Sequence, residues 1–83
     1  MEEEKRKVIA ITGVNSFLGA NLCQRLQIDS RYKVVALDIK KPPFLLKDTL
    51  FYKVDLTEPT VDLTLSDILS ANNIETVVHC AFF

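Results

Sequence analysis

The sequence has few glycines and no long apolar segment, and both shortages exclude whole classes of protein. Its 83 residues include two glycines, three prolines, two cysteines and no tryptophan, which excludes collagen-like repeats, Gly/Pro-rich disorder and a disulfide scaffold. No apolar run approaches the roughly 20 residues that a transmembrane helix needs, and the first seven residues, MEEEKRK, lack the apolar core of a signal peptide. We therefore expect a cytoplasmic protein with no membrane partner, in which the cysteines stay reduced.

An excess of charge of one sign is also missing. Ten basic and eleven acidic residues give a formal net charge of −1, so electrostatic attraction to nucleic acid is not expected. Cys23, Cys80 and the single histidine, His79, have no metal-ligand spacing. We therefore expect no nucleic-acid partner and no metal site, and a hydrogen-bonded structural role for His79.

What the sequence does contain is an alternation of apolar strands and amphipathic helices. Short β-branched runs predict strands buried on both faces of a parallel sheet. The alternation predicts right-handed crossovers and an α/β, partial Rossmann fold, with four strands in the order 3-2-1-4 and flanking helices. We expect the first helix on one face of the sheet and the second near the other. The predicted strands are residues 7–12, 33–38, 50–54 and 75–81, and the predicted helices run from Asn15 or Ser16 to about Asp29 and from about Leu63 to Ala71.

The most informative segment is residues 8–19, where an apolar run breaks at a glycine and becomes helix-like. Such a turn brings a helix N-terminus to the pyrophosphate of a dinucleotide. Gly13 supplies the tight turn, and Gly19 supplies the close approach of helix and strand. Ser16 occupies the middle position of the three-glycine fingerprint. We expect its Cβ to crowd the pyrophosphate or to need an unusual backbone angle, and its hydroxyl to be available to a phosphate oxygen.

An acidic residue follows the glycine turn at a meaningful distance. Asp38 ends the second predicted strand about 20 residues after Gly19, as does the carboxylate that hydrogen-bonds the ribose 2′-hydroxyl in such folds. A carboxylate there repels a 2′-phosphate, so the sequence favours NAD over NADP, although Lys40 and Lys41 blunt that repulsion. The glycine turn alone is weak evidence, because any strand–turn–helix unit can use two glycines in this way.

Residues 12–19, TGVNSFLG, resemble the T-G-x-x-G-F-[IL]-G signature of the extended short-chain dehydrogenase/reductases, the NAD-dependent epimerase/dehydratase family. Residues 35–38 resemble its second strand, Asp55-Leu56 the pair that contacts adenine, and residues 77–81 the V-[IV]-H-x-A-A strand end, in which Phe82 replaces the second alanine. From the residues alone, Asp55 has a second reading as the cap of the following turn. The resemblance implies that NAD is held by Gly13, Asn15, Ser16, Phe17, Leu18, Gly19, Asp38, Asp55, Leu56 and Ala81.

The family's catalytic pair, a tyrosine with a lysine four residues later, is missing. Tyr32 is followed at that distance by Ala36, and Tyr52 by Leu56. We therefore expect residues 1–83 to be the N-terminal part of one NAD(P)-binding Rossmann domain, without a catalytic residue and without the rest of the domain or the substrate-binding region.

The resemblance further implies a parent epimerase, dehydratase or reductase that acts on nucleotide sugars by hydride transfer, an expectation that rests on family analogy alone. A non-catalytic NAD(P) sensor and a truncated fragment without activity remain alternatives. Because the fourth predicted strand would form an unpaired sheet edge, we expect a homodimer or an edge-mediated oligomer.

Overall fold

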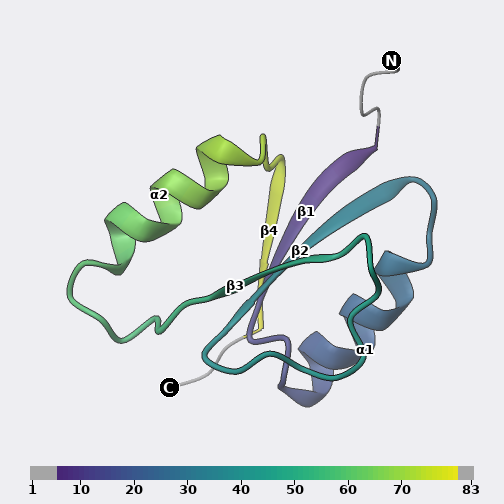
Figure 1. The fold of residues 1–83 in the computed structure, drawn as a ribbon, viewed down its shortest axis with the longest axis horizontal. Coiled ribbons are helices and arrows are strands. Elements are labelled where there is room, and N and C mark those ends of the chain that lie inside the picture. Colours follow the sequence, from purple (N-terminus) through teal and green to yellow (C-terminus); the bar gives the residue numbers. More distant parts are fainter. Residues whose placement is uncertain (1–5, 81–83) are drawn as a thin grey trace.

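The computed structural model describes residues 6–80 and forms a parallel four-stranded sheet with one helix on each face (Figure 1). The sheet order is β3-β2-β1-β4, and all three strand pairs are parallel. The predicted fold class and strand order are therefore confirmed. In chain order the elements are β1 (Lys7–Thr12), α1 (Phe17–Gln27), β2 (Tyr32–Asp38), β3 (Leu50–Lys53), α2 (Val61–Ala71) and β4 (Thr76–His79).

The element boundaries differ from the prediction by one or two residues at several ends. Helix α2 begins at Val61, two residues before the predicted Leu63, and β2 begins one residue early, at Tyr32. Strand β3 ends at Lys53, but the N–H of Val54 still donates to the Asp38 carbonyl at 2.9 Å, so the contact with β2 continues one residue further. Strand β4 runs from Thr76 to His79, so the predicted strand includes one residue too many at Glu75 and another at Cys80. Ala81, where the predicted strand ends, falls outside the described residues.

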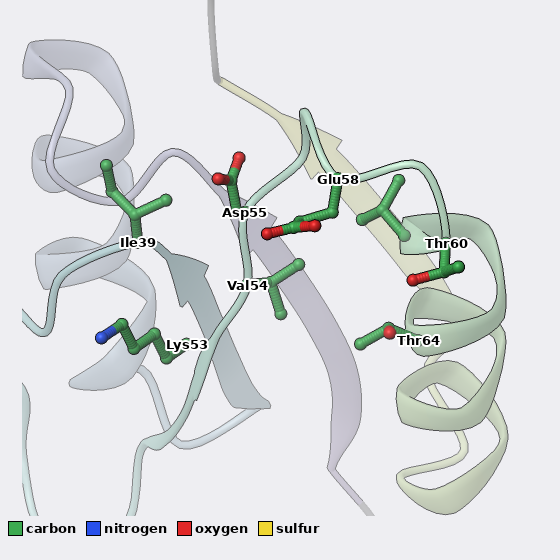
Figure 2. A pocket seen from close by; sticks show the side chains of 8 residues that line it. Ile39, Lys53, Val54, Asp55, Glu58, Thr60 and Thr64 are labelled. Carbon is green, nitrogen blue, oxygen red and sulfur yellow. The ribbon is translucent and has the colours of Figure 1, made fainter.

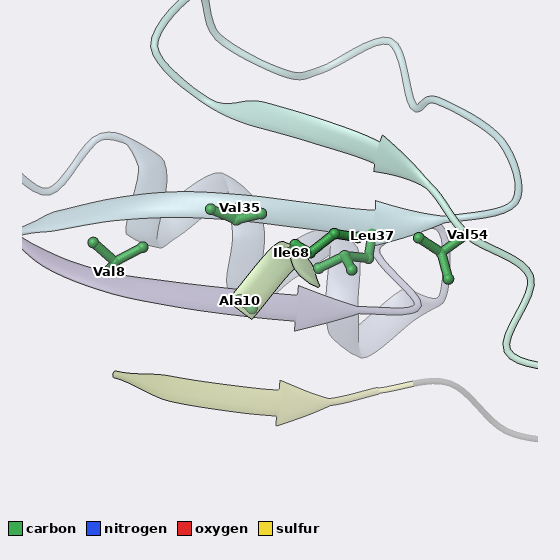
Figure 3. Packing of buried hydrophobic residues seen from close by; sticks show 6 residues of the cluster. All are labelled: Val8, Ala10, Val35, Leu37, Val54 and Ile68. Carbon is green, nitrogen blue, oxygen red and sulfur yellow. The ribbon is translucent and has the colours of Figure 1, made fainter. Parts of the chain in front are cut away.

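Alternation along the strands divides the core between the two faces of the sheet. Val8 and Ala10 of β1 face α2, whereas Ile11 faces α1 together with Cys23 of that helix. This is the period-2 pattern of a sheet that is covered on both sides. The predicted placement of the two helices on opposite faces is confirmed. Figure 3 shows the α2-side cluster, which consists of Val8, Ala10, Val35, Leu37, Val54 and Ile68.

Parallel pairing brings the carboxyl ends of all four strands to one edge of the sheet. Thr12 at the end of β1 is level with Leu37 of β2 and with His79 of β4, and Asp38 is level with Lys53 of β3. Ligands of open α/β sheets bind at this edge, so the residues that follow each strand define where to look for a site. In the described part of the chain, no helix is long and apolar enough to cross a membrane.

Candidate functional site

The turn after β1 depends on a backbone conformation that favours glycine. Gly13 has a φ of 69°, in the left-handed region where a side chain is strained. Its N–H donates to the Leu37 carbonyl at 2.9 Å, and its carbonyl accepts from the Ser16 N–H at 2.9 Å. The predicted tight turn at Gly13 is therefore present, and it is anchored to β2 as well as to the start of α1.

Gly19 lies where α1 crosses closest to this turn. A Cβ built on Gly19 would stand 2.2 Å from the Gly13 carbonyl oxygen and 3.0 Å from the Ser16 Oγ. The carbonyl belongs to the backbone, so a side chain at position 19 would force α1 away from β1. The close helix–strand approach predicted for this glycine is confirmed.

Ser16 is the N-cap residue of α1. Its backbone is ordinarily extended, with φ −71° and ψ 160°, so the expected unusual backbone angle is wrong. Its Oγ donates to the Gly13 carbonyl at 2.7 Å and accepts from the Gly19 N–H at 3.0 Å. The middle position of the motif coincides with the N-cap of α1, where serine is strongly preferred. The hydroxyl proton that was expected to be available to a phosphate is therefore engaged within the turn.

The first turn of α1 presents backbone donors at the edge of the sheet. A helix leaves its first N–H groups without intrahelical partners; here the Ser16 side chain satisfies that of Gly19, and the Ser16 carbonyl satisfies that of Ala20. Within residues 6–80, the hydrogen bonds leave the N–H groups of Phe17 and Leu18 unpaired. Phe17 is 87% exposed, so its predicted place at the rim of the turn is open to solvent.

Asp38 and the glycine turn meet directly. The Asn15 N–H donates to Asp38 Oδ2 at 2.9 Å, and the Ile39 N–H donates to Asp38 Oδ1 at 2.7 Å. Each carboxylate oxygen thus has one backbone donor, and a carboxylate has about four acceptor positions in all. Two acceptor positions remain for hydroxyl groups of a ligand, on a side chain whose orientation is already fixed.

A cavity of about 540 Å³ opens beside the end of β3 (Figure 2). Ile39 and Lys53 lie on one side of it and Thr60 and Thr64 on the other, with Asp55 between them. The remaining lining residues are Val54, Glu58 and Val61.

Asp55 is already engaged in a turn at the rim of this cavity. Its Oδ1 accepts from the Thr57 hydroxyl at 2.6 Å and from the Thr57 N–H at 2.9 Å. These two hydrogen bonds hold the pKa of the Asp55 carboxyl below its usual range. The alternative reading, that Asp55 caps the following turn, therefore describes what this side chain does here.

The predicted adenine pair is divided between two cavities. Asp55 lines the 540 Å³ cavity, whereas Leu56 lines a smaller apolar one of about 90 Å³ between the sheet and α2, together with Thr12 and His79. The side chain of Leu56 packs on the α2-side core. The two side chains thus lie apart. The resemblance implies an adenine contact by the side chain of Asp55 and by the backbone of Leu56, and that backbone stays beside Asp55.

Thr12, the last residue of β1, lies at the carboxyl edge of the sheet and was not among the predicted site residues. Its buried hydroxyl lies 2.7 Å from His79 Nδ1 and accepts from the Cys80 N–H at 3.3 Å. The predicted hydrogen-bonded role of His79 is confirmed. A polar residue at the end of an apolar strand could have marked Thr12 in the sequence. Its partners, His79 and Cys80, could not be inferred from the sequence because they lie far away along the chain. The predicted site residue Ala81 and the variant Phe82 lie outside the described residues.

Both cysteines are buried and free of disulfide bonds. Cys23 and Cys80 are buried in the same α1-side cluster, and burial raises the pKa of the Cys23 thiol to about 11. Among residues 6–80, no three His, Cys, Asp or Glu side chains gather as a metal site would require.

The NAD dependent epimerase/dehydratase family matches residues 9–82 of the chain. The chain belongs to this family. None of the curated proteins compared with the chain matches it, so solved structures provide the individual relatives.

Solved structures of epimerases and dehydrogenases share the fold of this family member. UDP-glucuronic acid 4-epimerase from Bacillus cereus, in complex with NAD, is 29% identical with a TM-score of 0.68, covering 89% of this chain and 26% of that one. UDP-glucose 4-epimerase from Thermotoga maritima is 27% identical with a TM-score of 0.71, covering 89% and 24%. A short chain dehydrogenase from Leptospira borgpetersenii with bound NAD+, at 19% identity and a TM-score of 0.77 over 95% and 32%, shares the fold. The chain spans about a quarter to a third of the length of these proteins.

Proposed function

We propose that the chain binds the adenosine diphosphate half of NAD, as the dinucleotide-binding portion of a longer NAD-dependent epimerase or dehydratase. The observation that carries this proposal is the hydrogen bond between the Asn15 N–H and Asp38 Oδ2. It joins the glycine turn, which suits a pyrophosphate, to a carboxylate that suits a ribose, at the edge of the sheet where ligands of this fold bind.

The pyrophosphate is proposed to lie against the N-terminus of α1. The unpaired N–H groups of Phe17 and Leu18 point out of the first turn, and the helix dipole adds a partial positive charge at the same place. Gly13 allows the left-handed turn, and Gly19 lets α1 pack directly against the Gly13 carbonyl, so the N-terminus of α1 lies at the edge of the sheet. These features support a phosphate site formed by backbone N–H groups. Residues 13–16 contain no charged side chain that could contribute to it.

The ribose is proposed to donate its hydroxyls to Asp38. A carboxylate accepts such hydrogen bonds but repels a 2′-phosphate, by about 1 kcal/mol at 4 Å in bulk water and about 4 kcal/mol at the effective dielectric of a protein surface. This difference supports NAD as the cofactor and makes NADP the weaker ligand. The adenine is proposed to enter the 540 Å³ cavity beside Ile39 and Asp55, with the Asp55 carboxylate accepting from its amino group.

The substrate and the reaction are proposed for the longer protein and not for these 83 residues. Bound NAD supplies hydride transfer, but the sequence has no tyrosine with a lysine four residues later. The more similar solved structures described above are UDP-sugar 4-epimerases at 27 and 29% identity. That similarity supports a nucleotide-sugar substrate, with the residues that would contact it outside the present chain.

Calorimetric titration of the 83-residue chain tests the cofactor proposal. We expect binding of NAD, weaker binding of NADP, and loss of that preference in Asp38→Asn, which keeps the shape of the side chain and removes its charge. Asp67→Asn is the matched control, because Asp67 is an exposed acid on α2 away from the site. No heat with either nucleotide would contradict the proposal, and a preference for NADP in the unsubstituted chain would contradict the role of Asp38.

We also propose that this chain self-associates through β4. Among the described strands, β4 pairs only with β1, and Val77 on it is 48% exposed. A sheet edge with an apolar side chain is a template for pairing with a second copy. We expect sedimentation to show a dimer or larger species that Val77→Lys weakens and the control Asp67→Lys does not. A monodisperse monomer would contradict this proposal.

A further inference from the structure

One side chain, that of Asn15, ties the start of the β2–β3 loop to the glycine turn. The Asn15 Nδ2 donates to the Lys40 carbonyl, while the backbone N–H of Asn15 donates to the Asp38 carboxylate. A single residue therefore holds both the acid at the end of β2 and the peptide two positions beyond it. The two contacts are separable, because only the contact with Lys40 depends on the amide side chain.

A second anchor holds the same loop further along. Gln27 is the last residue of α1, and its Nε2 donates to the Phe44 carbonyl at 2.8 Å. Its Oε1 accepts from the Leu46 N–H at 3.2 Å and from the Thr49 hydroxyl at 2.8 Å. Figure 1 shows this connection, drawn in teal, running alongside α1. The loop is thus fixed near both of its ends: the carbonyl of Lys40 takes part in the first anchor, and Lys41 follows directly.

The charges of these lysines matter because of where the loop begins. Lys40 and Lys41 are exposed and stand two and three residues after Asp38. A carboxylate next to a ribose 2′ position disfavours a phosphate there, whereas an ammonium group at the same place would favour one. Which of the two charges a ligand meets depends on the direction in which the loop leaves β2, and the bond between Asn15 and the Lys40 carbonyl fixes that direction.

We propose that Asn15 is a positioning residue that sets the discrimination between a ribose 2′-hydroxyl and a 2′-phosphate. It holds the Lys40 peptide, and its loss would free the start of the loop and let the ammonium groups of Lys40 and Lys41 approach the ligand position beside Asp38. The inference rests on the proposed function, because it requires the ribose to lie at Asp38.

The test uses Asn15→Ala, which removes the amide and keeps the backbone N–H that bonds Asp38. The ligands are ADP-ribose and 2′-phospho-ADP-ribose, which lack the nicotinamide and differ only at the 2′ position. We expect the ratio of the two dissociation constants, phosphorylated over unphosphorylated, to fall about two- to tenfold, the change that one net hydrogen bond is worth. Asn21→Ala is the matched control: its amide donates to the Phe17 carbonyl at 2.8 Å within α1 and holds no loop.

A triple variant tests whether the charges of the two lysines are responsible. In Asn15→Ala combined with Lys40→Ala and Lys41→Ala, we expect the ratio to return to that of the chain in which only the lysines are replaced. A shift that persists without the lysines overturns the inference.

Two further outcomes are distinguishable from these. An unchanged ratio in Asn15→Ala, with ADP-ribose still bound, assigns Asn15 a structural role alone and overturns the inference while the proposed function stands. Failure of the unsubstituted chain to bind ADP-ribose overturns the proposed function, and the inference with it.

Discussion

The two halves of the candidate site are built in different ways. At the β1–α1 turn, hydrogen bonds join Gly13, Ser16 and Gly19, and there is no room for one more carbon atom. At the β3–α2 corner, α2 begins at Val61, and the side chain of its N-cap residue, Thr60, makes no capping hydrogen bond. This corner borders a cavity of about 540 Å³. The first half suits a group that backbone donors must meet at fixed distances, as a pyrophosphate does. The second half suits a flat group that is held by packing.

Gly19→Ala is the change that should break the phosphate half most completely. Its Cβ would meet the Gly13 carbonyl oxygen at 2.2 Å, and overpacking of this kind costs about 1–3 kcal/mol, against a gain in helix propensity of about 1 kcal/mol. We expect a net loss of unfolding free energy in urea and loss of NAD binding. Gln24→Ala on the exposed face of α1 is the control, with NAD binding retained. Normal NAD affinity in Gly19→Ala would contradict the close-packed account of this turn.

Substitution of the two N-cap residues, Ser16 and Thr60, compares the two halves of the site directly. Ser16→Ala deletes a hydroxyl that bonds two backbone groups, and loss of such a cap costs about 1 kcal/mol. Thr60→Ala deletes a side chain that makes no capping bond, so its effect should stay within about 0.5 kcal/mol. Ser16→Gly restores the family motif and should cost only a few tenths of a kcal/mol. Urea unfolding of the three variants checks the order, and equal losses for Ser16→Ala and Thr60→Ala would show that the two corners do not differ.

Titration of the Asp55 carboxyl with acid tests the half of the site that is proposed to hold the adenine. The Thr57 hydroxyl and N–H lower the pKa of Asp55 in the folded chain. A carboxyl whose folded pKa is lowered stabilises the fold above its unfolded pKa, and this contribution is lost as the pH falls through the folded value. Thr57→Val keeps the N–H and removes the hydroxyl, so we expect the Asp55 pKa to rise toward its ordinary value and this loss to begin at a higher pH.

Carboxyl carbon NMR measures that titration residue by residue. Thr64→Val, on the α2 side of the same cavity, should leave the Asp55 pKa unchanged. The pKa of Asp29, lowered to about 2 by Arg31 on the surface, should also stay where it is in both variants. An Asp55 pKa that does not move in Thr57→Val would contradict the turn seen here.

The fold could be predicted almost entirely from local patterns, because each strand is a short apolar run and each helix has a clear apolar face. The start of α2 was placed two residues late, at Leu63, although Val61 lies four residues before Leu65 and packs against the same core. Ser16 shows a different limit: its residue type predicts a helix cap and its motif position predicts a phosphate contact, and only the folded turn decides between them.

The contacts that depend on tertiary structure could not be predicted. The bond between Thr12 and His79 can be predicted only if the register of β1 against β4 is known. The hydrogen bond from Asn15 to the Lys40 carbonyl can be predicted only if the path of the loop after β2 is known. Neither pair has a sequence spacing that marks it. The separation of the Asp55 and Leu56 side chains likewise depends on tertiary packing, because each lines a different cavity beside α2.

Amide NMR of the chain during titration with NAD tests the central claim most directly. The account predicts the largest shifts at the unpaired N–H groups of Phe17 and Leu18 and at Ile39, whose N–H bonds Asp38, with smaller shifts around Asp55. Absence of shifts, or shifts confined to Asn72, Asn73 and Glu75 at the opposite end of the sheet, would contradict it.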